Sequence, residues 1–542
     1  MSRELKTQIL IVGASTGGTA AAIAAASLGA RVILTEPTIW IGGQLTSQAV
    51  PPDEHPWIEE FGCTRRYRAL REGIRQRFRD TSNLTDAAKK DPRINPGGGV
   101  VSKLCHDPRL SLHVLNQMLQ PFIASGQVQV LLRHEPLSAD VEQDRVRSVT
   151  IQNIDTHEQI SIAADYFLDA TELGDLLPLA KCEYVSGAES KKQTGEPHGP
   201  DDANPDNVQG FTWCMPVALD PAPGAKHVIE KPRQYEQWRT YVPHLTPPWP
   251  GRLISYTYSQ PISLKPISRH ILSKDPKQVT LWRYRQIVRD DIYKENPPHP
   301  VTLVNWPQND YWEHNVIDKP REDVAVYVEE ARQLSLSLLY WMQTEAPRHD
   351  EKGEGYPNLH LIPEIVGSKD GLALAPYFRE SRRIKALFTV TENHVGSTAR
   401  FGSEVPINKL KPGQTAEIFS DTVGIGYYRI DLHPSTAGKN YIDIASLPFQ
   451  IPLGALIPQR LTNLLPACKN LGTTHITNGC YRLHPVEWNI GESAGLLAAH
   501  CLNKKCGPHE IHADKTKLAD FQSLLAQQGV ELAWPDKVYP KT

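Results

Sequence analysis

The sequence lacks the features that mark cysteine-rich, membrane-spanning and strongly charged proteins. Its eight cysteines are scattered over 542 residues without a CxxC pair, which argues against a zinc site, a dithiol redox pair and a disulfide scaffold. No uninterrupted apolar run reaches about 18 residues, so no transmembrane helix is expected. The formal charge of -3 gives no general attraction for nucleic acid or an anionic membrane. We therefore expect no metal site, no nucleic-acid partner and no membrane span.

The N-terminus also lacks the pattern of a signal peptide. Its first ten residues, MSRELKTQIL, are charged and lead directly into an apolar run. Reduced thiols and the missing leader together predict a cytoplasmic location. The length of the chain exceeds what one ordinary core accommodates, so two or more domains are expected.

What the sequence does contain, at its start, is a βαβ unit. Residues 8–12 form a short apolar run, residues 19–28 are rich in alanine and end at a glycine, and residues 31–35 form a second apolar run. Such a unit implies two parallel strands joined by a right-handed crossover. The fold class it predicts is α/β, with a Rossmann-like parallel sheet.

The turn between the first strand and the helix indicates a dinucleotide site. Its sequence, GASTGG over residues 13–18, matches GxGxxG at the first and last positions only. Gly13 permits a tight turn, Gly18 lets the helix pack on the strands, and the helix N-terminus attracts a pyrophosphate. Ser15 is small enough for a close approach of the backbone, and Glu36 is placed to accept hydrogen bonds from ribose hydroxyls. A plain α/β turn is the alternative.

A second glycine site, Gly42-Gly43, follows Glu36 after a short loop. Here the sequence resembles the FAD-binding proteins of the glutathione-reductase structural type. In those proteins an acid followed by a glycine doublet lets the chain pass close to the adenine ribose and pyrophosphate side of FAD, whereas NAD domains do not need the doublet. The resemblance therefore implies FAD.

Further stretches extend this resemblance along most of the chain. They are DATELGD (residues 169–175, with Glu172 where the family usually has Gly), PYFRESRRI (376–384), YRIDLHP (428–434) and NLLPACKNLGTTH with the following RLHP and GESAG. Taken together, the chain resembles the FAD-dependent oxidoreductases that have the succinate dehydrogenase/fumarate reductase flavoproteins as relatives. In this family the last helix points its N-terminus at the flavin ring, and we expect that helix to begin at Gly491.

The turn and the resemblance together assign a set of residues to the cofactor. They are Gly13, Ser15, Thr16, Gly18, Glu36, Gly42, Gly43, Gln44, Thr171, Asp175, Gly491 and Glu492. Some relatives attach the flavin through a His or Cys, and His55 and Cys63 follow the glycine doublet, but nothing in their spacing favours a link. We expect non-covalent FAD.

The middle of the chain has a different character. Residues 127–132, 146–151 and 159–163 predict a small antiparallel layer, and residues 166–170 predict a buried strand. Proline and polar loops then dominate, with one clear helix over residues 323–342. We read this region as an α+β cap, or substrate domain, inserted into the FAD domain. The expected divisions are 1–178 and 455–505 for the FAD-binding domain, 179–454 for the cap, and 506–542 for a tail with a short helix.

Four residues are candidates for the chemistry. His475 and His484 flank the loop before the last helix and can act as the base that hydride transfer to flavin N5 requires; packing roles are the alternative. Arg482 lies between them and suits a carboxylate or the flavin O2 edge, and Arg379 suits bidentate carboxylate binding, unless it forms structural ion pairs.

The function that these observations predict is oxidation or dehydrogenation of a small organic substrate, one option being a substrate with a carboxylate. No second GxGxxG is found, so the electron acceptor stays open among oxygen, a quinone and others. An NAD(P)H-driven flavin monooxygenase is the alternative enzyme. A non-redox binding protein with an FAD fold is the alternative outside enzymes.

Overall fold

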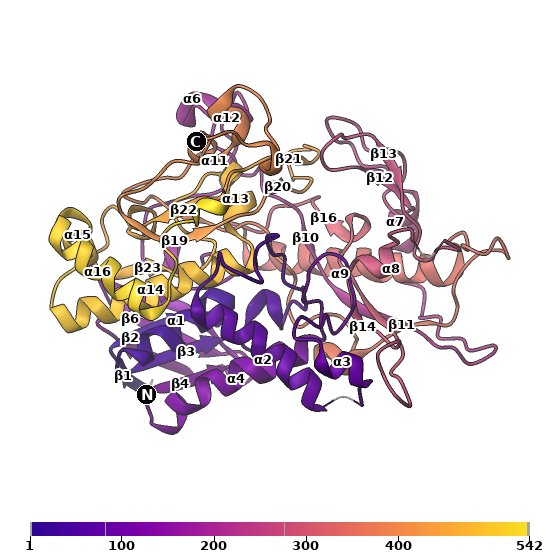
Figure 1. Ribbon diagram of the computed structural model, residues 1–542, viewed down its shortest axis with the longest axis horizontal. Coiled ribbons are helices and arrows are strands. Elements are labelled where there is room, and N and C mark those ends of the chain that lie inside the picture. Colours follow the sequence, from indigo (N-terminus) through magenta and orange to yellow (C-terminus); the bar gives the residue numbers. More distant parts are fainter. Residues whose placement is uncertain (1–2, 82, 276, 539–542) are drawn as a thin grey trace.

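The computed structural model of the protein describes residues 3–81, 83–275 and 277–538. It contains a five-stranded parallel sheet with the strand order β23-β8-β2-β3-β4, whose strands β2, β3 and β4 lie at the lower left of Figure 1. Because β23 comes from the last fifth of the chain, both ends of the sequence build this sheet, as a divided α/β domain requires. The strands are β2 (Ile9–Val12), β3 (Val32–Glu36), β4 (Val128–Leu132), β8 (Tyr166–Asp169) and β23 (Leu464–Pro466).

One strand lies in a different sheet from the one expected. Residues 127–132 were expected in the antiparallel layer, but β4 pairs in parallel with β3. The reason is α4 (Pro108–Ala124), which separates the two strands and forms a crossover connection instead of a hairpin. The separate four-stranded sheet has the order β1-β7-β6-β5. Its strands are β1 (Arg3–Lys6), β5 (His134–Glu142), β6 (Arg145–Asn153) and β7 (Gln159–Ala163).

Two helices from opposite ends of the chain pack directly on each other above the parallel sheet. They are α1 (Thr16–Ser27) and α14 (His484–Lys504), and α1 is buried from Thr16 to Ala26. A Cβ atom placed on Gly491 would lie 2.0 Å from the carbonyl oxygen of Gly17. One on Gly495 would lie 2.3 Å from that of Ala21. Small residues therefore let the two backbones touch.

The expected start of the last helix was wrong. Helix α14 begins at His484, seven residues before Gly491, with Pro485 in its first turn. Proline fits there because its missing N–H needs no partner and its φ is already helical. Gly491 and Glu492 therefore lie inside the helix, where the glycine serves close packing against α1.

The first and last parts of the chain contain further helices, and the indigo and yellow ribbons lie together on the left of Figure 1. They are α2 (Arg65–Thr81), α3 (Asp86–Lys90), α5 (Leu176–Leu179), α13 (His475–Tyr481), α15 (Pro508–Ala513) and α16 (Lys515–Gln528). The expected C-terminal tail thus holds two helices. Among the described residues, no helix combines the length and apolarity that a bilayer crossing requires.

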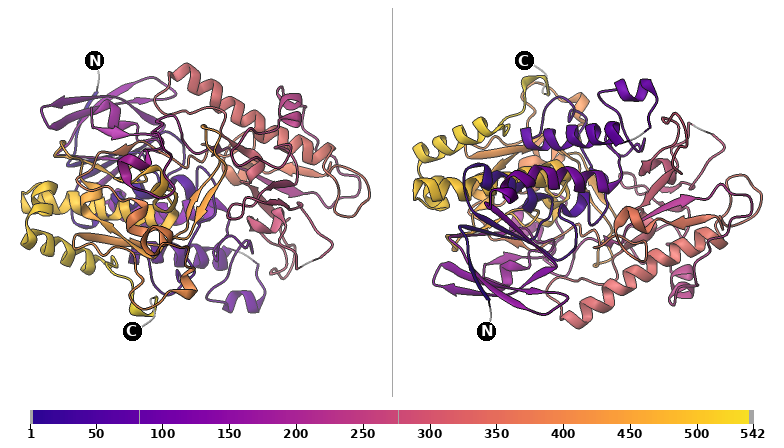
Figure 2. Two further views of the ribbon diagram at one scale, coloured as in Figure 1. Left: turned by 90° about the horizontal axis from the view of Figure 1, so that it is seen from above. Right: turned by 90° about the horizontal axis from the view of Figure 1, so that it is seen from below.

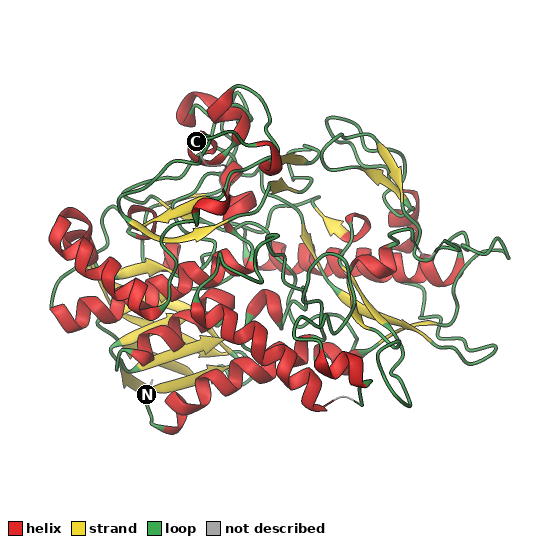
Figure 3. Cartoon of the chain, in the orientation of Figure 1, coloured by secondary structure: helices red, strands yellow, loops and turns green. Residues whose placement is uncertain are grey.

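The middle of the chain forms the other half of the molecule, which consists largely of loops in Figure 3. Its centre is a four-stranded antiparallel sheet with the order β14-β15-β11-β17. The helix α9 (Arg321–Thr344) lies in the same half and confirms the helix predicted over residues 323–342. In both views of Figure 2 the long pink helix α9 lies well away from the yellow helices. The elements are β11 (Met215–Leu219), β14 (Gln286–Val288), β15 (Val301–Val304), β17 (Leu359–Leu361), β10 (Phe211–Thr212), β16 (Asp310–Tyr311), β12 (Thr257–Ser259), β13 (Pro266–Ser268), α7 (Tyr235–Thr240), α8 (Leu281–Tyr284) and α10 (Pro363–Val366).

The segment between this half and β23 packs against the hydrophobic core beside the parallel sheet. Val423, Ile430 and Phe449 share one hydrophobic cluster with Ile11 and Leu497. The division at residue 454 stays a prediction, because residues on both sides of it belong to the same hydrophobic cluster. The elements of the segment, with the two that precede it, are β9 (Tyr184–Val185), α6 (Lys191–Thr194), β18 (Arg383–Ile384), α11 (Glu392–Val395), α12 (Ser397–Phe401), β19 (Thr422–Gly426), β20 (Ile430–Leu432), β21 (Ile442–Ile444) and β22 (Phe449–Pro452).

The contact between α1 and α14 gives a stability prediction. Gly491→Ala puts a methyl group against the Gly17 carbonyl, so the helices must separate, and overpacking of this kind costs about 1–3 kcal/mol. We expect a lowered midpoint in thermal unfolding followed by circular dichroism. Gly507→Ala is the matched control, because a Cβ there meets no atom within 4 Å. Equal midpoints for both variants would contradict the packing role.

Candidate functional site

The glycine turn predicted from the sequence sits at the N-terminus of α1. Gly13 has φ +94°, and a Cβ on it would lie 2.4 Å from the Ala170 oxygen, so no larger residue fits. Ser15 caps the helix, with its Oγ accepting a hydrogen bond from Gly18 N at 3.1 Å. A Cβ on Gly18 would lie 2.1 Å from the Gly13 oxygen, which agrees with the expected close packing.

The glycine doublet lies against this turn. The backbone N–H of Gly42 donates to Ala14 O at 2.7 Å, and the Thr16 hydroxyl donates to Gly42 O at 2.9 Å. Gly43 has φ +51°, and a Cβ on it would lie 2.9 Å from Ser15 Cα. The two glycine sites therefore form one backbone-lined cradle. A side chain at either position would obstruct it.

Glu36 ends β3, and its carboxylate is fixed beside the turn. Its Oε2 accepts from Ala14 N at 3.1 Å and its Oε1 accepts from Thr38 N at 2.9 Å. Burial raises the pKa of Glu36 to about 7, although both hydrogen bonds oppose that shift.

Gln44 joins the cradle to the start of α14. Its Nε2 donates to the Arg482 carbonyl at 2.9 Å and to Glu487 Oε2 at 2.5 Å. The other oxygen of Glu487 accepts from Gly17 N, in the first turn of α1, at 3.3 Å. The N-termini of α1 and α14 thus meet at one carboxyl group.

This carboxyl group shares its surroundings with a buried ion pair. Lys469 bonds to Glu172, which replaces the glycine usual in DATG, and the lysine side chain is 1% exposed. Burial raises the pKa of Glu487 to about 7, which Lys469 opposes and Glu172 reinforces. Oε1 of Glu172 has no hydrogen-bond partner among the described residues.

The DATELGD stretch forms a turn that uses its own polar groups. Thr171 donates its backbone N–H and its hydroxyl to Asp169 Oδ1, and Asp175 N donates to the Thr171 hydroxyl. Asp175 pairs with Arg382 at 3.0 Å. Glu492 accepts from Arg66 at 2.7 Å and from Trp488 at 2.9 Å, inside α14. A cofactor role for Thr171, Asp175 and Glu492 stays a prediction.

A cavity of about 580 Å³ opens where the two halves of the molecule meet. Its walls include Asp53 from the loop after the doublet, Arg379, Asp431, His433 and Arg482. Two of the four predicted catalytic residues, Arg379 and Arg482, therefore line it. Since Arg482 also bonds to Gln44 through its carbonyl, the cavity adjoins the glycine cradle.

His433 forms the clearest acid–base pair in the cavity. Its Nδ1 lies 2.5 Å from Asp310 Oδ2, which assigns a proton to Nδ1 and leaves Nε2 as the basic nitrogen. Burial lowers the pKa of His433, and Arg379 lowers it further. Asp310 is fully buried, yet Arg379 and His433 hold its pKa below the usual value. This orientation is the one a general base needs.

Arg379 supports this pair more than it faces a ligand. Its Nη1 donates to Gly210 O and the Thr212 hydroxyl, and its Nη2 donates to Asp310 Oδ1 at 2.9 Å. Arg482 donates from Nη1 to the Tyr377 hydroxyl at 2.7 Å, while its Nε has no partner among the described residues.

His484 lies behind the cavity wall. Its Nδ1 accepts from the backbone N–H of Asp53 at 3.0 Å, and its Nε2 has no partner among the described residues. Burial lowers the pKa of His484 to about 3, so the ring is neutral. It positions the backbone of a cavity residue.

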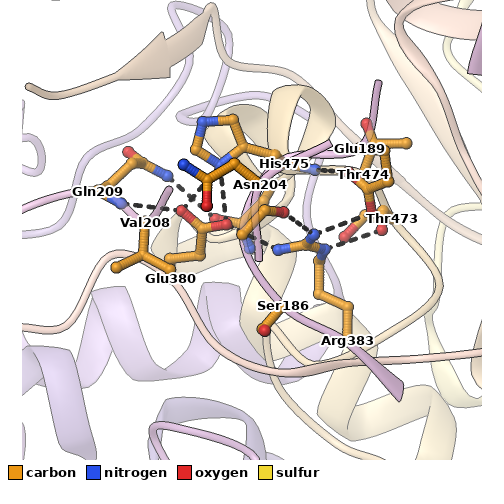
Figure 4. Close-up of polar contacts among 12 residues, drawn as sticks. Ser186, Glu189, Asn204, Val208, Gln209, Glu380, Arg383, Thr473, Thr474 and His475 are labelled. Atoms are coloured by element: carbon orange, nitrogen blue, oxygen red, sulfur yellow. Dashed lines mark hydrogen bonds and ion pairs between the residues drawn. The ribbon is translucent and has the colours of Figure 1, made fainter. Parts of the chain in front are cut away.

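The structure places His475 outside the cavity. Figure 4 shows its ring directed at Glu380, with Nδ1 2.8 Å from Oε1, and Arg383 directed at the same carboxylate and at Glu189. Arg383 also donates to Thr473 O at 3.0 Å. This buried network joins three distant segments of the chain, which is the packing role that was the alternative for His475.

The residues that the sequence did not single out come mainly from one quoted stretch. YRIDLHP supplies Asp431 and His433, but an Asp and a His two residues apart give no sign of which surface they face. Asp310 and Arg285 lie in segments without a motif. The position of the pair became evident only from the pairing of β16 with β10, which brings Asp310 beside Thr212.

Neither candidate for a covalent flavin link has the properties of one. Burial raises the pKa of the Cys63 thiol to about 12, and the side chain is buried. His55 lines the cavity, but its Nε2 is bonded to Gly62 O at 2.9 Å.

One family model and several solved structures are similar to this chain. A family model described as FAD dependent oxidoreductase matches residues 8–525. No curated protein matches the chain. Similar solved structures include an L-proline dehydrogenase from P. horikoshii, at 13% identity over 34% of this chain and 24% of that one, with a TM-score of 0.18.

Two further structures are a geranylgeranyl bacteriochlorophyll reductase-like protein from Thermoplasma acidophilum and the flavin-dependent monooxygenase PieE with FAD and substrate. The first is 10% identical, covers 97% of this chain and 85% of its own, and has a TM-score of 0.31. PieE is also 10% identical, covers 72% of this chain and 52% of its own, and has a TM-score of 0.30. This chain spans less than two thirds of the proline dehydrogenase and of PieE. The family match over residues 8–525 carries the conclusion: the chain belongs to the FAD dependent oxidoreductases and is an enzyme that uses FAD.

Proposed function

We propose that this enzyme oxidises a small organic molecule held in the cavity between its two halves, and that His433 is the base of the reaction. The observation that carries this proposal is the shared position of Arg482. Its carbonyl bonds to Gln44 beside the glycine cradle, and its side chain reaches Tyr377 in the cavity wall. Cofactor cradle and cavity thus adjoin at one residue.

The residues of the cradle suit FAD. A Cβ atom on Gly13 would clash with Ala170 O and one on Gly43 with Ser15 Cα, so both positions of the cradle require glycine, and Gln44 Oε1 is buried without a partner among the described residues. Gly13, Ser15, Thr16, Gly18, Gly42 and Gly43 would hold the pyrophosphate side, and Glu36 would hold the ribose. Bound FAD supplies the acceptor for a hydride from the substrate.

The protein manages the proton that leaves with the hydride. His433 lines the cavity, and its Nε2, 3.8 Å from Asp431 Oδ2, takes the proton of the substrate's O–H or N–H group. Asp310 holds the Nδ1 proton and stabilises the imidazolium that forms. Arg379 fixes Asp310 in turn. A substrate carboxylate is favoured because arginines line the same cavity.

The first measurement is the visible spectrum of the purified protein before and after acid precipitation. We expect flavin absorbance that moves to the supernatant, because Cys63 is a buried, protonated thiol and His55 is bonded to Gly62. Colour that stays in the pellet would contradict non-covalent FAD. Anaerobic bleaching by NADPH alone would favour a monooxygenase over the proposed oxidation.

The proposed base gives a second prediction. With a substrate that bleaches the flavin, His433→Asn should slow reduction by about 10²–10⁴-fold, because this is the range lost with a positioned general base. Asp431, whose Oδ2 lies 3.8 Å from His433 Nε2, is an acceptor that remains in the variant. Since burial lowers the pKa of His433 below 6.5, wild-type kcat/KM should fall only when the pH drops below 6.5.

The control for this prediction is His475→Gln, which removes a histidine outside the cavity. It is expected to lower stability with little change in the pH profile of the folded fraction. Stopped-flow measurement of flavin reduction gives the pH profiles of both variants. A range of about pH 4–8 covers the ordinary histidine pKa of about 6.5. An unchanged acid limb in His433→Asn would exclude His433 as the base.

Glu487 predicts a pH dependence of FAD binding. Its raised pKa keeps it protonated below about pH 7, and above that pH its charge lies at the N-terminus of α1, next to the expected phosphates. The dissociation constant of FAD should therefore rise as the pH rises through about 7. Lys469, Glu172 and Gln44 face the same group and limit the effect.

Equilibrium dialysis of FAD against the apoprotein at several pH values tests this expectation. Glu487→Gln should flatten the profile, whereas Glu492→Gln, on the same helix but bonded to Arg66 and Trp488, should keep it. A profile that is equally steep in Glu487→Gln would assign the dependence to another group.

A further inference from the structure

We propose that the cavity accepts a carboxylate attached to a ring, and that Arg285 is the residue that binds the carboxylate. This rests on the proposed function, since it names the substrate class of the same cavity. Arg285 lies between α8 and β14, and its side chain is 12% exposed. It belongs to none of the stretches that the sequence brought to notice.

Arg285 differs from the other buried arginines of the cavity in its partners. Arg379 is bonded to Asp310 at 2.9 Å, and Arg482 to the Tyr377 hydroxyl at 2.7 Å, and among the described residues each leaves only its Nε buried without a partner. The nearest acid to Arg285 is Asp53, whose Oδ2 lies 3.8 Å away, beyond hydrogen-bond distance. Nε and Nη1 of Arg285 have no hydrogen-bond partner among the described residues.

A cation in this position favours an anionic ligand. Unmade hydrogen bonds of a buried charged group are costly, so oxygen atoms that approach Nε and Nη1 gain the full benefit. Asp53 compensates the charge without a hydrogen bond, because its Oδ2 stays 3.8 Å away. Burial raises the pKa of Asp53 against the opposing effects of Arg285 and Arg482. A carboxylate supplies both the charge and the acceptor atoms.

Three other unpartnered groups in the wall can donate hydrogen bonds, whereas His55 Nδ1, on a ring whose Nε2 donates to Gly62 O, is an acceptor. Trp306 Nε1, Asn305 Nδ2 and the Tyr441 hydroxyl are buried and have no partner among the described residues. A ligand rich in oxygen acceptors matches such a wall. A ligand that mainly donates hydrogen bonds does not.

The ring is inferred from the aromatic walls. Tyr258, Tyr428 and Trp306 line the cavity. Tyr284 also lines it, but its ring already lies under the guanidinium of Arg285, whose carbon is 5.5 Å from the ring centroid. Aromatic side chains bind planar or apolar ring faces by stacking and burial, which a two- or three-carbon acid does not exploit.

Three probes test the proposal on the oxidised FAD-loaded enzyme: benzoate, its neutral analogue benzamide, and acetate, which has the charge but no ring. Equilibrium dialysis measures binding without turnover, and flavin absorbance provides a second reading. We expect benzoate to bind about 10- to 100-fold more tightly than benzamide, the range expected when a charge-assisted bond is lost. Benzoate should also bind more tightly than acetate.

Arg285→Gln should abolish the preference for benzoate over benzamide while FAD stays bound. Arg269→Gln is the matched control, because Arg269 lines the same cavity and lies over the same Tyr284 ring at 5.5 Å. It should keep the preference, since no nitrogen of Arg269 is among the buried, unpartnered atoms of the described residues. If Arg285→Gln does not fold, Arg285→Lys keeps the charge and should retain part of the preference.

Four outcomes would overturn the proposal: equal binding of benzoate and benzamide, a preserved preference in Arg285→Gln, equal losses in both variants, or no benzoate binding up to about 10 mM, the weak limit of specific recognition. Failure of the proposed function is separate. It would appear as a flavin that no substrate reduces, or as a His433→Asn enzyme with normal reduction, while the binding measurements stay valid.

Discussion

The contact between α1 and α14 is the constraint on which the site depends. Gly17 and Gly491 let the two backbones touch, and this brings both helix N-termini to the same edge of the parallel sheet. The first helix offers the glycine turn, and the chain entering the second supplies Arg482, His484 and Glu487. If the helices stood a normal side chain further apart, Gln44 would not reach Arg482 and Glu487. The cradle and the cavity would then be separate places.

Charge compensation governs the rest of the site. Buried acids such as Asp310 and Glu380 have an arginine within hydrogen-bond distance. The pair of Asp310 with Arg379 and the contact of Glu380 with His475 join segments far apart in the sequence. They serve as fixed points, because removing one partner leaves a buried charge that costs several kcal/mol, about 3–5 in comparable cases. Against this pattern, Arg285 stands out by its 3.8 Å distance from Asp53. That difference underlies its assignment to a ligand.

Local patterns allowed the cofactor side to be predicted, because its residues are neighbours in sequence. The βαβ unit, Gly13, Glu36 and the glycine doublet lie within the first 43 residues, and each acts through the backbone that follows or precedes it. The start of α14 was missed because glycine was given more weight than Pro485. His433 was not singled out for a different reason. The partner of each histidine, Glu380 for His475 and Asp310 for His433, comes from a remote segment, so no local pattern shows which histidine meets a cavity.

The division of the parallel sheet also determines when the protein can fold during its synthesis. Gly17 meets Glu487 across a separation of 470 residues, and β23 must be made before the sheet has its last strand. At a translation rate of about 5–20 residues per second, the alanine-rich face of α1 waits about 25–95 s for its partner. During that time an apolar helix is uncovered on the nascent chain. The half formed by the middle of the chain has a hydrophobic cluster that lies almost entirely within residues 211–359. The residues of that core are therefore synthesised before α14.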